Sequence, residues 1–273
     1  MSVLAKISEI EDKWHALLGA ECKRIFENHH IPSHNASHHE RVWANAKLLI
    51  RAMGNTRHGF SSLSIESLIT ACFFHDTGLT VTIDEKHGKA SSDLCNNFLK
   101  AIPDLIPESI DEILSAIEFH ENKEYLKENA NPFSLLSILS AADDADAFGY
   151  IGIYRYAEIY LMRQISIQHL ASIVLANLDS RFNNIKKQYQ NFTEFYMQME
   201  QNYLIARNFY TDLQRGYLTN SANYTQSIIQ IIQTEIIEKH KLPIYVWLEQ
   251  LNKPNSLETI DFIYKIIQEH NGV

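Results

Sequence analysis

The sequence predicts an all-α fold. Apolar residues recur every three or four positions through most of the 273 residues, as they do along one face of an amphipathic helix. We find no convincing alternation of apolar and polar residues, which would indicate half-buried strands. The chain has only 9 Gly and 6 Pro, and several of them stand where a helical pattern begins or stops.

The composition is that of an ordinary globular protein, with 45% hydrophobic and 21% charged residues. The formal net charge of −9 argues against long nucleic acid as a partner. It is compatible with a small phosphorylated molecule, because a bound metal ion inverts the local charge. Cys22, Cys72 and Cys95 are far apart and form no C-x-x-C pair. We interpret them as buried apolar side chains in a reducing cytoplasm.

The N-terminal segment predicts an amphipathic helix. Acidic residues separate apolar residues at helical spacing, namely Leu4, Ile7, Ile10, Trp14, Leu17 and Leu18. A signal peptide would need a basic start and a continuous apolar run. No later segment has the uncharged length that spans a bilayer. We therefore expect a cytoplasmic protein with no membrane partner.

Further helices follow from start and stop signals. Ser37 and Glu40 form a capping-box pattern that predicts a helix start at His38. The next helices are expected at about 64–76 with a stop at Gly78, at about 87–100, from Pro107 to about 120, and from Pro132 to 146. Long helices follow Gly152, with breaks at Pro243 and Pro254. The aromatic-rich segment 181–217 is compatible with core packing, a dimer surface or a cover over a site.

Five of these helices direct an imidazole or a carboxylate toward the apolar side. Burying several such groups is costly unless something compensates their charge and polarity. A divalent metal ion does so, and helix bundles build metal sites from inward side chains on facing helices. The residues at these positions are His38, His75, Asp76, His87, His120, Asp143 and Asp146.

A single inward histidine is more often a core or surface residue than a metal ligand. We give this interpretation to the remaining scattered histidines, which are His15, His29, His30, His39, His58, His169, His240 and His270. For the inward set, the joint occurrence on five helices favours a metal site.

Three blocks of sequence resemble the HD-domain superfamily of metal-dependent phosphohydrolases. The first is H-N-A-S-H-H-E-R-V at 34–42, similar to the H-x-x-R-V block of that family. The second is A-C-F-F-H-D-T-G at 71–78, which contains the doublet that names the family. The third is A-D-D-A-D-A-F-G at 142–149, similar to its A-D-x-x-D-A-x-G helix. The resemblance implies that His38, His75, Asp76 and Asp143 bind metal.

Two shorter blocks resemble a subset of that family. H-G-K-A-S at 87–91 is similar to an H-x-x-x-S helix start, and I-E-F-H at 117–120 to an I-x-x-H helix. The resemblance implies that His87 and His120 bind a second metal or contact the substrate phosphate. Asp144 and Ala145 depart from the usual Arg and Leu, which leaves the subfamily open.

The resemblance covers about residues 25–155, and with it we divide the chain into three parts. Residues 1–24 form an N-terminal helix on the core, 25–155 an HD metal-binding bundle, and 156–273 an all-helical C-terminal extension.

The leading hypothesis is metal-assisted hydrolysis of a phosphate mono- or diester, most naturally in a nucleotide. Asp76, His87, His120 and Lys89 are the candidate catalytic residues, and Asp76 is suited to bridge two ions. Arg41 and Asp146 are expected behind the ligands, either paired with each other or orienting a ligand histidine. Lys89 is equally compatible with a solvated helix position.

The cofactor is expected to be one or two divalent ions, without a choice among Mn, Mg, Fe, Co, Ni and Zn. The same six residues also serve HD-type di-iron oxygenases, so oxygen chemistry stays an alternative. A third alternative is a non-catalytic module that senses a metal or a nucleotide. A homodimer is compatible with the sequence.

Overall fold

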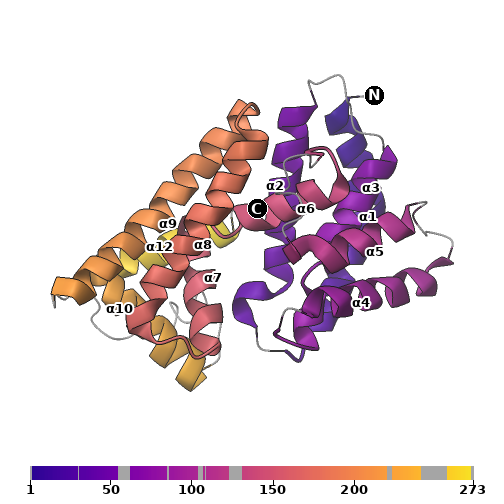
Figure 1. Ribbon diagram of the computed structural model, residues 1–273. Coiled ribbons are helices and arrows are strands. Elements are labelled where there is room, and N and C mark those ends of the chain that lie inside the picture. Colours follow the sequence, from indigo (N-terminus) through magenta and orange to yellow (C-terminus); the bar gives the residue numbers. More distant parts are fainter. Residues whose placement is uncertain are drawn as a thin grey trace. The chain divides into compact units, whose positions relative to one another are not determined.

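The computed structural model describes residues 2–29, 31–54, 62–84, 86–103, 107, 109–122, 131–219, 223–240 and 257–271. Helices are the only regular structure in this part of the chain, which confirms the all-α prediction (Figure 1). The expectations for His30, His58, Pro243 and Pro254 lie outside the described residues.

The chain forms two compact units. Unit 1 consists of Met1–Ala145 and Gln188–Phe195, and unit 2 of Asp146–Lys187 and Tyr196–Val273. The domain limits expected at residues 24 and 155 stay predictions.

Unit 1 is built around α3 (Ser62–Phe74), whose residues 65–74 are all buried. A helix buried on every side needs neighbours on every side. These neighbours are α1 (Val3–Phe26), α2 (Ala36–Met53), α4 (His87–Ala101), α5 (Ile110–Phe119) and α6 (Leu135–Ala145). Helix α2 also packs on α6, and α5 on both α4 and α6.

Polar contacts fix α1 on the rest of unit 1. The indole nitrogen of Trp14 donates to Glu66 of α3 at 2.5 Å. The indole nitrogen of Trp43 on α2 donates to Glu11 at 2.8 Å. Both aromatic rings are buried, so each indole nitrogen needs such an acceptor. Helix α1 therefore packs on α2 and α3 through these polar contacts.

The predicted start of the next helix was wrong by two residues. Helix α2 begins at Ala36, and the side chain of Asn35 caps it by accepting from the backbone nitrogen of Ser37 at 3.0 Å. Glu40 does not complete a capping box with Ser37, because its carboxylate lies 2.7 Å from the ring of His15 on α1. The contact between His15 and Glu40, which are distant in sequence, therefore prevents the predicted capping box at the start of α2.

Three other boundaries also differ from expectation. Helix α5 begins at Ile110 rather than at Pro107, and α6 ends at Ala145, before Asp146. Gly78 is not a simple helix stop, since it lies inside a short 3₁₀ helix, η2 (Thr77–Thr80). A Cβ atom there would stand 2.0 Å from the carbonyl oxygen of His87, so the glycine permits the close approach of η2 to α4.

Unit 2 contains α7 (Gly149–Met162), most of α8 (Ile167–Tyr189) and of α9 (Thr193–Thr219), α10 (Tyr224–Ile231), a π-helical segment η6 (Ile232–His240) and α12 (Leu257–Asn271). The adjoining ends of α8 and α9, within Gln188–Phe195, belong to unit 1. Helix α7 packs on α12 and η6. Aromatic residues of the segment 181–217 pack inside this unit. The rings of Phe182 and Tyr203 are stacked with their centres 4.1 Å apart. The Tyr210 hydroxyl donates to the carbonyl of Ile153 at 2.8 Å.

Among the described helices, none combines the length and the apolar character needed to cross a membrane.

The cap of α2 gives a first prediction. Asn35→Ala should lower the free energy of unfolding by about 1 kcal/mol, because the backbone nitrogen of Ser37 loses its side-chain acceptor. Ser37→Ala, the matched control, should leave that free energy nearly unchanged. Urea unfolding followed by circular dichroism measures both, and a larger loss in Ser37→Ala would contradict the assignment of the cap.

Candidate metal centre

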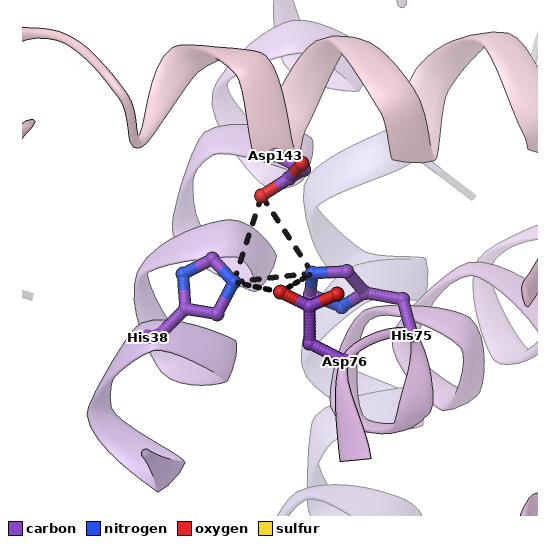
Figure 2. Close-up of side chains that lie close together, drawn as sticks. All are labelled: His38, His75, Asp76 and Asp143. Atoms are coloured by element: carbon purple, nitrogen blue, oxygen red, sulfur yellow. Dashed lines mark hydrogen bonds and ion pairs between the residues drawn. The ribbon is translucent and has the colours of Figure 1, made fainter. Parts of the chain in front are cut away.

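Four side chains of unit 1 converge from three helices. His38 lies in the first turn of α2, and Asp143 in the last turn of α6. His75 and Asp76 follow the end of α3, where the backbone nitrogen of His75 still donates to Ala71 at 3.0 Å. Figure 2 shows both imidazole rings and both carboxylates turned toward one point.

The atoms that face this point are close together. His38 Nε2 lies 3.1 Å from His75 Nε2, 3.3 Å from Asp76 Oδ2 and 3.5 Å from Asp143 Oδ1. His75 Nε2 lies 3.6 Å from Asp76 Oδ2 and 3.7 Å from Asp143 Oδ1. Ligands about 2.0–2.2 Å from a common ion at right or tetrahedral angles are roughly 2.8–3.6 Å apart. The four residues therefore have the spacing of a divalent-metal ligand set.

A second group shares Asp76 with the first. His87 Nε2 lies 3.2 Å from Asp76 Oδ1, and His120 Nε2 lies 3.1 Å from the same oxygen. His87 begins α4, and His120 follows α5 at the start of the short helix η4 (His120–Asn122). The ligand atoms of each group lie within 4.8 Å of one another. One carboxylate oxygen of Asp76 thus faces each group.

Three of the imidazoles are oriented by their own chain. The Nδ1 atoms of His75, His87 and His120 donate to backbone carbonyls three residues earlier, those of Cys72, Asp84 and Ile117, at 3.0, 2.8 and 2.7 Å. A carbonyl only accepts, so Nδ1 carries the proton and Nε2 is directed at Asp76. Metal-binding histidines are usually held in this way, and the donor set fits a divalent ion.

Burial and charge act in opposite directions on the shared carboxylate. Burial raises the pKa of Asp76, but the charge of His75 and hydrogen bonds from His120, His38 and His87 outweigh it. The pKa of Asp76 therefore lies well below its usual value. Burial likewise lowers the pKa of His87, but Asp76 raises it to about 9. Without an ion, protons on imidazole offset the buried negative charge.

Ser91 and Gly88, to which the sequence assigned no role of their own, support the second group. Ser91 Oγ accepts from the backbone nitrogen of Gly78 at 2.7 Å, which ties the segment after Asp76 to α4. Gly88 lies so close to α5 that a Cβ atom there would be 2.5 Å from the carbonyl oxygen of Glu118. These contacts join backbone segments that are distant in the sequence. The small residues at the contact points are the only sign of them in the sequence.

His39 is closer to the site than expected. It is fully buried, its Nδ1 donates to the carbonyl of Cys72 at 3.0 Å, and its ring centre is 5.0 Å from that of His75. Both rings therefore use the same carbonyl. Burial lowers the pKa of His39 well below its usual value, so the ring is neutral near pH 7.

The remaining predicted site residues lie differently. Lys89 is exposed and pairs with Asp93, four residues later, at 2.6 Å. Asp146, which follows the end of α6, is buried and accepts from Arg155 at 2.9 Å. Arg41 is buried on α2. The catalytic role of Lys89 and the supporting roles of Arg41 and Asp146 stay predictions.

The fold and the two ligand groups define a helical protein of the HD type. A family model named HD-CE matches residues 20–175, which is more than half of the chain. The chain belongs to the HD-CE family, and the predicted resemblance to HD domains is confirmed. Comparison with curated proteins and with solved structures gave no match.

The geometry of the first group predicts a loss of metal. His38→Ala should weaken binding of one divalent ion by 100-fold or more, because it removes a ligand at the centre of the group. Titration of the metal-free protein with Mn²⁺, followed by calorimetry, measures the affinity. Lys89→Ala is the control and should bind as the parent does. Equal binding by His38→Ala and the parent would contradict the ligand assignment.

The raised pKa of His87 predicts that protons compete with metal. The protonated imidazole is favoured up to about pH 9 in the ion-free protein, so an ion at the second group must displace a proton. The apparent affinity should rise as pH increases from 7 to 9, by up to about tenfold per pH unit, and level off above that.

The same shift has an opposite effect on the ion-free fold. The folded-state pKa of His87 is raised, so its contribution to stability is fully present below its unfolded pKa and is lost as pH rises through about 9.

The competition between protons and metal is measured by calorimetry in buffers of different ionisation enthalpy, which counts the protons released when the ion binds. The exposed-helix variant His169→Asn should release as many as the parent, and binding without proton release would contradict the proposed competition.

Proposed function

We propose that this protein is a metal-dependent phosphohydrolase that acts on a phosphate mono- or diester, with a nucleotide as the preferred substrate class. The observation that carries the proposal is the position of Asp76. Its two carboxylate oxygens face two separate groups of imidazoles, at 3.1–3.6 Å. Two-metal hydrolases use such a shared ligand to hold two ions on one phosphoryl group.

His38, His75, Asp76 and Asp143 would hold the first ion. A bound divalent ion lowers the pKa of coordinated water toward neutrality and offsets the charge of phosphoryl oxygens. The protein's part is to keep Nε2 of each imidazole directed inward and to exclude bulk water from the ligands. Asp143 is the most exposed of the four, with 13% of its side chain accessible against 0–7% for the others. We expect substrate and water to enter on the side of Asp143.

His87 and His120 would serve in one of two ways. With two ions bound, both rings would be neutral and would hold the second ion through their Nε2 atoms. With one ion bound at the first group, a protonated His87 would be placed to donate a hydrogen bond to a phosphate oxygen. In both cases the residues act on the phosphate, and the preference for a nucleotide rests on the family resemblance.

The competing functions use the same residues. A di-iron oxygenase would need the same six side chains, and a sensor would bind a metal or a nucleotide without turnover. The family and the ligand groups are common to all three, so the reaction itself must separate them.

The test is turnover by the purified protein. With Mn²⁺, Mg²⁺, Co²⁺ or Ni²⁺, the protein should release phosphate or nucleoside monophosphate from a panel of nucleotide mono- and diesters. Asp76→Asn should lower kcat at least 1,000-fold with little change in far-UV circular dichroism, because it weakens both ion sites. Lys89→Ala should reduce activity by less than tenfold.

Other outcomes would overturn the proposal. Bound iron with oxygen uptake and no phosphate release would establish the oxygenase. Tight metal binding with no turnover of any ester would establish the sensor.

A further inference from the structure

The carbonyl group of His120 lies at a point where the chain leaves a helix. Helix α5 ends at Phe119, and the three-residue helix η4 begins at His120. The last carbonyls of a helix have no hydrogen-bond donor within it, and a buried carbonyl must therefore accept from a donor elsewhere. Here Ser140 of α6 supplies it: the Ser140 hydroxyl donates to the carbonyl oxygen of His120 at 3.0 Å.

This contact completes the fixation of His120. Its Nδ1 donates to the carbonyl of Ile117 at 2.7 Å, and its Nε2 lies 3.1 Å from Asp76 Oδ1. The first of these contacts orients the ring relative to α5, but neither joins the backbone of His120 to another helix. Ser140 does so, and both residues are buried, with 3% of each exposed.

The position of Ser140 on α6 links the two ligand groups. It lies three residues before Asp143, and residues at this spacing lie on one side of a helix. The same helix thus carries a ligand of the first group and the residue that holds a ligand of the second. Asn45 of α2 fixes α6 at this level by donating to the carbonyl of Ala142 at 3.2 Å.

We infer that Ser140 is a positioning residue for the second ion: through the carbonyl of His120, it holds that imidazole at the distance from Asp76 that a shared ion requires. The inference rests on the proposed two-ion function. It assigns Ser140 no contact with substrate or ion. Outer partners of metal ligands commonly contribute 10- to 100-fold to metal affinity.

The experiment is a Mn²⁺ titration of the full chain, followed by calorimetry and by electron paramagnetic resonance, which separates paired from single Mn²⁺ ions. The parent should bind two ions. Ser140→Ala should bind the second ion roughly 10- to 100-fold more weakly, with the first ion unaffected. Ser140→Thr retains the hydroxyl and should recover most of that affinity.

Ser137→Ala is the matched control. Ser137 lies on the same helix and is equally buried, but its hydroxyl accepts from Ser134 at 2.9 Å. This variant should bind both ions as the parent does. If Ser140→Ala does not fold, Ser140→Cys takes its place, because a thiol has nearly the same size and is only a weak donor.

The outcomes separate this inference from the proposed function. If the parent binds two ions and Ser140→Ala binds both with parental affinity, the inference fails and the proposed function stands. Equal weakening of both ions, or equal weakening by Ser137→Ala, would indicate general loosening of α6 and would also overturn it. A parent that binds one ion overturns the inference alone, and a parent that binds none overturns both.

Discussion

The carboxylate of Asp76 is the constraint on which unit 1 depends. A buried acid is tolerated only with compensating partners. Asp76 has imidazoles on both sides, with His38 and His75 near Oδ2 and His87 and His120 near Oδ1. These residues come from the start or end of α2, α3, α4 and α5. The charge of Asp76 is therefore compensated only when those four helices are packed together.

The helices and their inward faces could be predicted from the sequence because a period of three to four residues is a local property. The six residues of the two ligand groups could be predicted for the same reason, with the family resemblance to support the assignment. His38, His87 and Asp143 lie on α2, α4 and α6, and His75, Asp76 and His120 directly follow the ends of α3 and α5. The inward faces of these helices meet in the bundle and bring the six side chains together. The sequence indicated Asp76 as suited to be shared because a carboxylate has two oxygens, but Asp143 meets that criterion too. Only the positions of His87 and His120 in the structure single out Asp76.

The errors have a common physical origin in contacts between distant segments. Ser37 has the right pattern for a cap, but Glu40 is engaged by His15 of another helix, and Asn35 caps α2 instead. Gly78 has the appearance of a stop signal, but it is small because α4 approaches its backbone. Asp146 has helical spacing from Asp143, but α6 ends between them. No local pattern contains this information.

The orientation of the imidazoles has a consequence for how the site tolerates change. His75, His87 and His120 each take their acceptor from the main chain of their own turn. Every residue type has a carbonyl, so replacing the side chain of Cys72, Asp84 or Ile117 does not remove the acceptor. Each histidine and the carbonyl that orients it therefore lie within one segment of four consecutive residues. The surroundings of such a centre can therefore diverge widely in evolution, and new substrates can be accommodated, while the direction of the three nitrogen lone pairs is inherited unchanged.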